Sequence, residues 1–368
     1  MNICSISPQE LFSSAFFTIP KEVYEGDELW HKENPHVIAW MFSDANPYFK
    51  NIKTNIWEVD TTCRLAGFFN PTLLIDGQKV AFFGYWETHN NQEANQQLFA
   101  TFEQWAKEQG AAKVFGPINM TTYGSYRIQL EPTQRTPFFG EPYNPIYYKT
   151  ILEQCGYSIF MNYHSVIGHG DHIQVGAQAT PMFEAQLKKN NLKVVPLTPD
   201  LWMERQEEIH SIFQALWQNN FGFVPIDLHT FQTFFSRTTA EQLDPDVSIA
   251  VLDTDNKIAA YLAVYPDYGP IMNTLSSSPT FARDFPLLTG PAMLQKTGCV
   301  HPKYRKQHLF TAISVIACGK AVEKGYKNVV GCLIRSDNHS GKMDDFVKRI
   351  KPDATITKPT YGLFSKSL

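Results

Sequence analysis

The chain has 368 residues, of which 43% are hydrophobic, 14% aromatic and 18% charged. That composition excludes a disordered chain, and the length corresponds to two domains or to one large one. The net charge of −4 offers no overall basic field for nucleic acid or for an anionic membrane surface.

The N-terminus and the cysteines indicate a reducing compartment and no membrane span. The first residues, MNICSISPQE, lack the basic stretch and apolar run of a secretory signal, and no apolar run approaches the ~20 residues that cross a bilayer. The six cysteines form no C-x-x-C pair and mostly lie in apolar runs. We therefore expect free buried thiols, rather than disulfides or a zinc site, in a cytoplasmic protein.

The first half of the chain predicts strands that alternate with helices. Hydrophobic spacing and turn residues predict a hairpin of strands 71–75 and 79–86 around Asp76-Gly77, a helix over 92–109 ended by Gly110, a buried strand over 113–118 and a helix over 145–154.

A polar stretch then separates the two halves. Residues 168–191 contain three glycines and precede a fresh strand-like run at 192–197. We therefore expect an N-terminal domain over 1–168, a linker over 169–191 and a C-terminal domain over 192–368.

The second half continues the alternation of strands and helices. The same signals predict a hairpin of strands 249–252 and 258–265, a strand over 293–300, a helix over 309–324 ended by Gly325 and a buried strand over 329–334.

One pattern occurs in both halves. Gly110 is followed four residues later by Val114, and Gly325 is followed four residues later by Val329, at an offset of 215 residues. The repeat favours a duplicated helix–glycine–strand unit. The alternative is a chance match between two ordinary α/β crossovers.

The second half resembles the GNAT acyltransferase superfamily. The resemblance rests on residues 295–310 (QKTGCVHPKYRKQHLF), which are similar to the strand, V-x-P-x-x-R motif and helix-opening loop of the family, and on residues 333–340 (LIRSDNHS), which resemble the next strand and its exit. Residues 60–368 as a whole resemble a bacterial group of proteins with two GNAT domains, through GPINMTTYGSYR at 116–127, FFGEPYNP at 138–145 and WQNNFGFVP at 217–225.

The donor loop departs from the family pattern. In GNAT enzymes an R-x-x-G-x-G/A loop lets bare backbone N–H groups and a helix N-terminus surround the pyrophosphate of acyl-CoA, and a Cβ at the glycines would hold the phosphates away. Here Arg305 matches the arginine, but His308 and Phe310 occupy the glycine positions.

Three interpretations of this departure stay open. The half keeps the fold without binding acetyl-CoA, or it binds acyl-CoA in an atypical way, or its donor is a carrier-protein phosphopantetheine, which has no pyrophosphate. In the last case Lys303, Arg305, Lys306 and His308 would present a basic patch to an acyl carrier protein. A solvated helix start is the plain alternative for such a cluster.

The resemblance also implies which reaction is catalysed and where the active site lies. A GNAT site catalyses direct attack of an amine on a thioester carbonyl, which requires a base, a donor to the developing oxyanion and an acid for the thiolate. The family places this site where the strand ending near Val300 splays from the strand ending near Ile334. Cys299 and Val300 would then contribute backbone N–H groups.

Four further side chains of the second half are candidates. The resemblance implies that Asn338 and Ser340 hold the pantetheine arm, with a helix cap as the alternative. It makes Tyr361 a candidate acid for the thiolate, with core packing as the alternative. Lys296 is a candidate ligand for an acceptor carboxylate, with a snorkelling lysine as the alternative.

In the first half, polar residues follow the equivalent strand. Thr122, Tyr126 and Arg127 should line the equivalent cleft, where Arg127 would clamp a carboxylate or phosphate or form an interdomain salt bridge. Glu141 is the candidate base, with a structural role as the alternative. Residues 87–92 (ETHNNQ) do not match the donor loop, so we expect acceptor binding or scaffolding from this half.

The histidines around the linker do not predict a metal site. His164, His169 and His172 lie on no helix that would fix their spacing, and no cysteine or glutamate completes a ligand set nearby in the sequence.

The sequence therefore predicts an α/β protein with two GNAT-like mixed-sheet domains in tandem. We expect a transferase that moves an acyl group from a CoA or carrier-protein thioester to the amine of a small biosynthetic acceptor, with acyl-CoA or acyl-carrier-protein phosphopantetheine as co-substrate and no permanent cofactor. The alternatives are a non-catalytic GNAT-derived scaffold, favoured by His308 and Phe310, and a tRNA-dependent aminoacyl transferase, which should be basic and is disfavoured by the net charge of −4.

Overall fold

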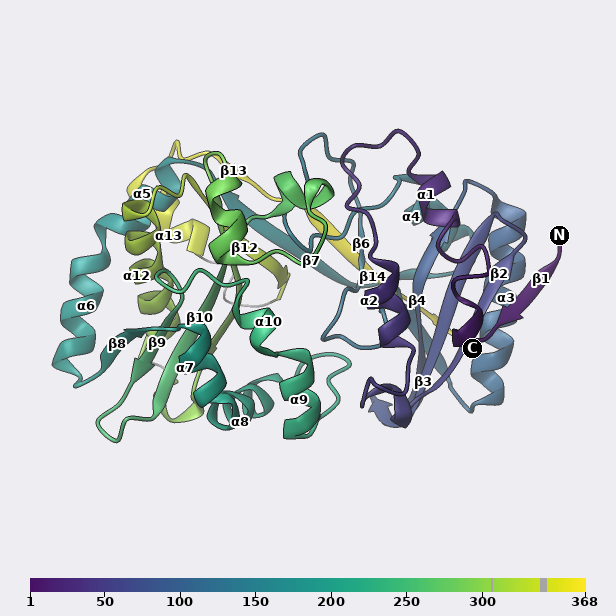
Figure 1. Cartoon of the computed structure of the whole chain (residues 1–368), viewed down its shortest axis with the longest axis horizontal. Coiled ribbons are helices and arrows are strands. Elements are labelled where there is room, and N and C mark those ends of the chain that lie inside the picture. The colour runs from purple at the N-terminus through teal and green to yellow at the C-terminus, as the bar shows by residue number, and fades with distance from the viewer. Residues whose placement is uncertain (306, 338–342) are drawn as a thin grey trace. The chain divides into compact units, whose positions relative to one another are not determined.

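The computed structural model describes residues 1–305, 307–337 and 343–368. The chain forms two compact units of mixed α/β structure (Figure 1). Unit 1 consists of Met1–Asn162, Asn220–Val224 and Thr360–Leu368, and unit 2 of Tyr163–Asn219 and Pro225–Pro359. In the described part of the chain, no helix is long and apolar enough to cross a membrane.

Unit 1 contains the first hairpin, the first long helix and the last strand of the chain. Its elements are β1 (Ile3–Ile6), α1 (Ile19–Val23), α2 (Pro35–Met41), β2 (Lys53–Val59), β3 (Cys63–Ile75), β4 (Gln78–Thr88), α3 (Gln92–Glu108), β5 (Lys113–Gly116), β6 (Ile128–Gln129), α4 (Tyr147–Gln154), the start of β7 (Ser158–Gly168) and β14 (Thr360–Ser367).

The sheet of unit 1 follows the order β1-β2-β3-β4-β5-β14, in which only β4 and β5 are parallel neighbours. The predicted hairpin is confirmed, because Ile75 pairs with Gln78 across a turn whose Asp76 and Gly77 both have positive φ.

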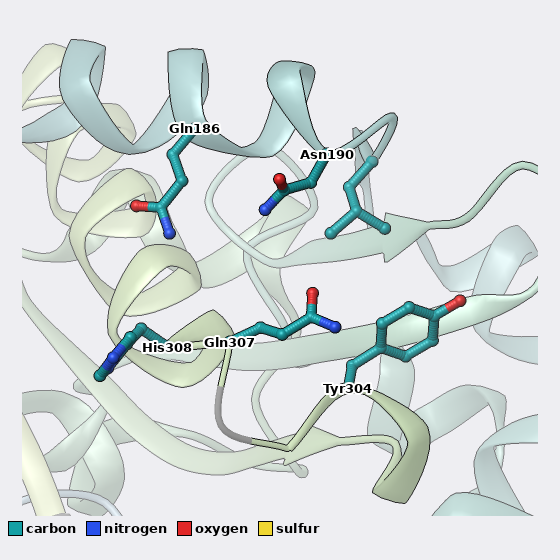
Figure 2. A pocket seen from close by; sticks show the side chains of 6 residues that line it. Gln186, Asn190, Tyr304, Gln307 and His308 are labelled. Atoms are coloured by element: carbon teal, nitrogen blue, oxygen red, sulfur yellow. The ribbon is translucent and has the colours of Figure 1, made fainter.

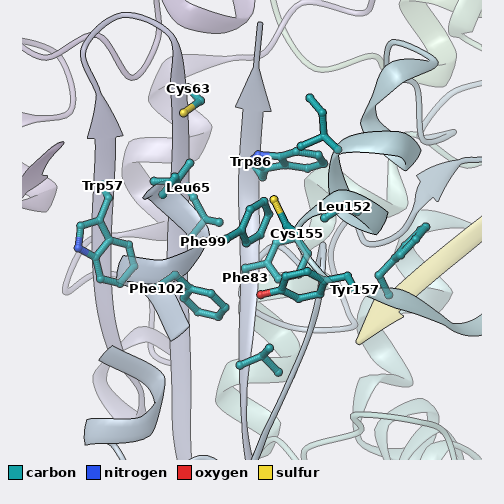
Figure 3. Close-up of a cluster of buried hydrophobic side chains, with 14 of the residues drawn as sticks. Trp57, Cys63, Leu65, Phe83, Trp86, Phe99, Phe102, Leu152, Cys155 and Tyr157 are labelled. Atoms are coloured by element: carbon teal, nitrogen blue, oxygen red, sulfur yellow. The ribbon is translucent and has the colours of Figure 1, made fainter. Parts of the chain in front are cut away.

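The core of unit 1 lies between this sheet and α3 (Figure 3). Ala94, Leu98, Phe102 and Ala106 recur every fourth residue and are fully buried, as an amphipathic helix requires. Phe83 of β4 contacts Phe99 of α3 edge-on, with ring centroids 5.2 Å apart.

Unit 2 contains the second sheet and the remaining helices. Its elements are the rest of β7, α5 (Asp171–Gln178), α6 (Thr180–Lys189), β8 (Lys193–Pro196), α7 (Pro199–Glu204), α8 (Gln206–Trp217), α9 (Leu228–Phe234), α10 (Arg237–Ala240), β9 (Ile249–Leu252), β10 (Ile258–Pro266), α11 (Phe281–Asp284), β11 (Ala292–Val300), α12 (Leu309–Glu323), β12 (Asn328–Arg335), α13 (Met343–Ile350) and β13 (Ile356–Thr357).

The sheet of unit 2 follows the order β7-β12-β11-β10-β9-β8, in which only β11 and β12 are parallel neighbours. Helix α12 is buried between this sheet and helices α5 and α6. Small residues allow the helices to approach: a Cβ on Gly176 would lie 3.1 Å from Cys318, and one on Gly319 would lie 2.4 Å from Thr180 Oγ1.

The duplicated unit expected from the sequence is present in both sheets. β4, α3 and β5 form one parallel crossover, and β11, α12 and β12 form the other. Gly110 and Gly325, which end the two helices, have φ of 88° and 95°, a conformation that glycine adopts without strain.

The division of the chain differs from the expected boundaries, among other places, at the predicted linker and at the last strand. Residues 169–191, predicted as a linker, form α5 and α6 inside unit 2, where Ile173, Phe183 and Leu187 are buried. The last strand, β14, belongs to unit 1, where Phe364 pairs with Gly116 of β5.

A second short segment of the later chain also belongs to unit 1. Phe221 packs against Phe115 and Phe160, with ring centroids 4.9 and 5.1 Å away, and the carbonyl of Gly222 accepts a hydrogen bond from Thr122 Oγ1 at 3.3 Å. The segment Asn220–Val224 is therefore part of the structure of unit 1.

Candidate active site

In unit 2, β11 and β12 separate to form a V-shaped gap. Their parallel pairing joins Ala292–Gln295 to Asn328–Gly331, whereas β11 continues to Val300 and β12 to Arg335. Within the described residues, no pairing between the two strands continues beyond Gln295. The splayed strands that the sequence predicted are thus confirmed.

Burial changes where the strands separate. Met293, Leu294, Val329 and Val330 are buried beside the paired part of the strands, while residues 295–298 and 331–335 are half-buried. Beyond their paired part, both strands are therefore partly exposed to solvent.

The gap is lined by backbone donors from β11. His301 N–H donates to Ala259 O on β10 at 2.9 Å, and the N–H groups of an antiparallel strand alternate in direction. The N–H groups of Gly298 and Val300 therefore point away from β10 and towards the gap. A strand N–H in this position is suited to bind a developing oxyanion.

Cys299 was expected to supply one of these donors, and the structure places it differently. Its N–H group points towards β10 by the same alternation, and its side chain is buried beside Tyr261. Burial raises the pKa of the Cys299 thiol to about 11. Neither group of Cys299 faces the gap.

A β-bulge places Lys296 where the gap opens. Ala263 of β10 is paired with Thr297 and Val264 with Gln295, so Lys296 is the extra residue. Its ammonium lies 5.4 Å from the ring centroid of Tyr265. Burial lowers the pKa of Lys296, while nearby Cys332 and Asp267 act in the opposite direction.

The residue that precedes α12 has a left-handed backbone conformation. His308, at the first glycine position of the motif, has φ of 56° and ψ of 24°, the left-handed conformation that favours glycine. The N-terminus of α12 carries no side-chain cap. Its backbone N–H groups are thus not occupied by a capping side chain.

A pocket of about 550 Å³ lies beside this loop (Figure 2). Gln186 of α6 and Asn190, which directly follows that helix, line one side and point towards the loop that carries Gln307 and His308. The lining is completed by Leu192 and Tyr304. The residues are mainly neutral and polar, and the pocket is next to the uncapped helix N-terminus.

Phe310, at the second glycine position, lies between the loop and the gap. A Cβ built on Gly298 would lie 2.7 Å from the ring of Phe310, so the ring rests directly on β11. It occupies space that the glycine of the family motif leaves open.

Three of the residues predicted to form a basic patch are exposed at the loop. Lys303, Arg305 and His308 are all exposed, and Tyr304 between them donates a hydrogen bond to Asp253 Oδ2 at 2.6 Å. The predicted site residues Lys306, Asn338 and Ser340 lie outside the described residues.

In unit 1, the chain itself fills the equivalent gap between β4 and β5. Ile118 N–H donates to Phe83 O at 2.7 Å, and Tyr85 N–H donates to Asn119 Oδ1 at 2.7 Å. A Cβ on Gly84 would lie 2.2 Å from Ile118 O. The space in which a donor would lie against β4 is therefore occupied.

The helix that starts beside this filled gap is also capped. Asn91 Oδ1 accepts a hydrogen bond from Ala94 N–H at 3.0 Å, which satisfies a donor that would otherwise face an anion. Unit 1 therefore lacks both the unpaired strand ends and the uncapped helix N-terminus that unit 2 has.

The candidate substrate residues of unit 1 belong to the segment that fills the gap. Tyr126 pairs with Ile118, and Arg127 N–H donates to Pro117 O at 2.8 Å. The guanidinium of Arg127 lies 3.7 Å from the ring centroid of Tyr126, and Arg127 is buried. Thr122 Oγ1 donates a hydrogen bond to the carbonyl of Gly222. These contacts support a role for the segment in stabilising unit 1.

The two candidate catalytic residues meet in unit 1. Tyr361 lies on β14 and donates a hydrogen bond to the carboxylate of Glu141. The same carboxylate accepts hydrogen bonds from Phe138 N–H at 2.9 Å and from both terminal nitrogens of Arg135. With four donors around a fully buried side chain, Glu141 is arranged as a structural acceptor, not as a base with a free lone pair.

Sequence reasoning missed the residues around Lys296. Tyr265, Asp267 and Cys332 lie on strands β10 and β12 or directly after them, and only the pairing of three strands brings them together. No motif in the sequence marks them. Among the described residues, no group of three histidine, cysteine or carboxylate side chains forms a metal site.

The two mixed sheets, each with one parallel crossover, define the class of the protein: it has the GNAT fold, in tandem. The tandem GNAT protein from the clavulanic acid biosynthesis pathway has this fold with a TM-score of 0.57 and 11% identity, over 100% of this chain and 98% of that chain.

Two other solved structures are similar. The GCN5-related glucosamine N-acetyltransferase region of a fungal multi-domain GH3 β-N-acetylglucosaminidase is 12% identical, covers 99% of this chain and 38% of that chain, and has a TM-score of 0.54. A probable N-acyltransferase from Enterococcus faecalis is 9% identical over 100% of this chain and 72% of that chain, with a TM-score of 0.53.

One curated protein is similar in sequence. Protein YghO of Escherichia coli (strain K12) is 25% identical over 283 residues, which are 72% of this chain and 68% of that protein. No family model matches the chain. At these identities the comparisons establish the fold alone.

Proposed function

We propose that unit 2 is an N-acyltransferase that moves an acyl group from a CoA or carrier-protein thioester to the amine of a small acceptor. In this proposal the thioester lies in the gap between β11 and β12, and the N–H groups of Gly298 and Val300 bind the oxyanion. Unit 1 serves as a scaffold.

The main support for this proposal is that the gap is filled in unit 1 and partly exposed in unit 2. The gap of unit 1 is filled by Ile118 and Asn119, whereas the gap of unit 2 is half-exposed on both strands and leads to an uncapped helix N-terminus. A duplicated fold that closes one site and keeps the other open favours chemistry at the open one.

Ligand-dependent unfolding tests this proposal. A ligand that binds the folded state raises the melting temperature by mass action, so acetyl-CoA, longer acyl-CoAs, free CoA and pantetheine should be compared. We expect stabilisation by at least one thioester donor and a weaker effect in Arg305→Ala. The absence of any response to all four kinds of ligand would refute the proposal.

The same experiment separates the two donors. Stabilisation by pantetheine without a further gain from the nucleotide end favours a carrier protein, which would dock on Lys303 and Arg305. That docking should weaken as salt rises from 50 to several hundred millimolar, because exposed charges are screened over roughly 10 Å at 0.1 M.

The position of Phe310 favours a second candidate, a non-catalytic scaffold. Its ring rests on Gly298 where the family leaves space for the donor. The double variant His308→Gly, Phe310→Gly restores the R-x-x-G-x-G pattern and tests this alternative. A scaffold that has lost its site gains acyl-CoA binding only in the double variant, whereas an enzyme with an atypical donor mode binds as the wild type.

A further inference from the structure

Lys296 lies on the face of β11 that is opposite α12. Its neighbour Gln295 faces α12, where its side-chain amide lies 3.5 Å from Ser314 O. Tyr265 is paired with Leu294, the residue before Gln295, so its ring lies on the face opposite α12, because successive side chains of a regular strand point to opposite faces. The ammonium of Lys296, the extra residue of the bulge, lies beside that ring. On that face α8 packs against β11, and Trp202 of α7 contacts Tyr261.

This face is the side from which an acceptor would reach a thioester in the gap. The uncapped N-terminus of α12 and the pocket at Gln186 and Asn190 lie on the α12 side, so a donor anchored there passes through the gap from that side. Under the proposed function, the acyl carbonyl would lie next to the bulge, and the attacking amine would approach past Lys296.

We infer that Lys296 is a specificity-determining residue that binds a carboxylate of the acceptor, so that the acceptor is an amine that also carries a carboxylate, such as an amino acid. This inference rests on the proposed acyl transfer. The ammonium is a compact cation with three donors, held at the apex of a half-exposed gap by a bulge that fixes its backbone.

The surroundings of the ammonium are suited to an anionic ligand. Lys296 is partly withdrawn from water beside the ring of Tyr265, and a charged group that has lost hydration gains most from a charge-assisted hydrogen bond. Asp267 lies close enough to influence the ammonium and would keep it directed while an acceptor carboxylate binds.

Two substitutions separate carboxylate binding from the role of a base. Lys296→Met removes the charge but keeps a similar length, whereas Lys296→Arg keeps a cation that stays protonated and can bind a carboxylate with two hydrogen bonds. Binding of a carboxylate should survive the arginine substitution, and catalysis by a neutral amine should not. Lys257→Met, which alters an exposed lysine of the β9–β10 turn, is the matched control.

The experiment uses the full chain and a panel of the common L-amino acids, each paired with its own carboxamide, with melting temperature as the readout. We expect at least one acid to bind the wild type and Lys257→Met roughly tenfold or more tightly than its carboxamide. That preference should disappear in Lys296→Met and persist in Lys296→Arg.

Equal stabilisation by acids and carboxamides, or by neither, would overturn the inference, as would a preference that persists in Lys296→Met. Acyl-CoAs and pantetheine are measured in the same series. A response to donors without a preference for acids refutes the carboxylate site and leaves acyl transfer standing. A preference for acids without any response to donors refutes acyl transfer as the use of the site.

Discussion

The hydroxyl of Tyr361 donates a hydrogen bond to the buried carboxylate of Glu141, 220 residues earlier in the chain. Arg135 pairs with the same carboxylate, so the three side chains form one buried polar network in unit 1. Tyr361 lies on β14, the last strand of the chain, and the network therefore holds that strand in the sheet of unit 1.

We predict that Tyr361→Phe lowers the stability of the chain without removing the acyl transfer proposed for unit 2. The ring stays and only the hydroxyl is lost, which leaves a buried carboxylate with one donor fewer and should cost about 1–3 kcal/mol. Urea unfolding measures the loss, and thiol release from an acyl-CoA measures activity in the folded protein. A loss of activity by a hundredfold or more at unchanged stability would instead make Tyr361 catalytic.

Local patterns in the sequence were sufficient for most elements of the fold. The spacing of Leu98 and Phe102 predicts α3, and the turn at Asp76-Gly77 predicts the hairpin of β3 and β4. Both signals are local, because burial of one helix face and a turn with positive φ depend on residues close in the chain.

The partners of distant segments could not be predicted in the same way. The apolar run at Tyr361 predicts a strand, but nothing within it indicates that Phe364 pairs with Gly116. The polar composition and the glycines of region 169–191 predict a linker, whereas Gly176 in fact lets α5 approach Cys318 of α12. The cluster around Lys296 likewise depends on strand pairing that leaves no motif.

The filled gap of unit 1 can be tested at Gly84. Gly84→Ala should lower the free energy of unfolding by roughly 3 kcal/mol or more, because the new Cβ would lie 2.2 Å from the backbone carbonyl of Ile118. Gly124→Ala is the control, since its Cβ would lie 3.3 Å from Asn119 O and should cost at most about 1 kcal/mol. Similar stability of the two variants would mean that the segment does not fill the gap in solution.

The left-handed conformation of His308 predicts that a glycine at this position is more stable than a valine. A residue with a side chain at φ of 56° carries a strain of about 1–2 kcal/mol that glycine does not have. Glycine, however, lowers the free energy of unfolding by about 0.4–1 kcal/mol, because it gives the unfolded chain more conformational freedom. His308→Gly should therefore be within about 1 kcal/mol of the wild type, and His308→Val should be clearly less stable, as judged by thermal unfolding. A glycine variant less stable than the valine variant would contradict this backbone conformation.

A carboxyl group in unit 1 predicts a dependence of stability on pH. Burial raises the pKa of Glu87 to about 7, with a contribution in the same direction from Glu33, while Arg64 and the hydroxyls of Tyr148 and Tyr24 lower it. Tyr148 donates to Glu87 Oε2 at 2.6 Å. Because the pKa in the folded state is raised, Glu87 favours folding most below about pH 4.5, its value in the unfolded chain.

That contribution should be lost as the pH rises to 7 and above, with a slope of at most about 1.4 kcal/mol per pH unit. Glu87→Gln keeps a similar shape but cannot ionise, so its free energy of unfolding should fall less steeply between pH 5 and 8 than that of the wild type. Glu25→Gln, which changes an exposed carboxyl, should keep the slope of the wild type. Urea unfolding at several pH values measures all three slopes, and parallel curves for Glu87→Gln and the wild type would show that Glu87 does not titrate in this range.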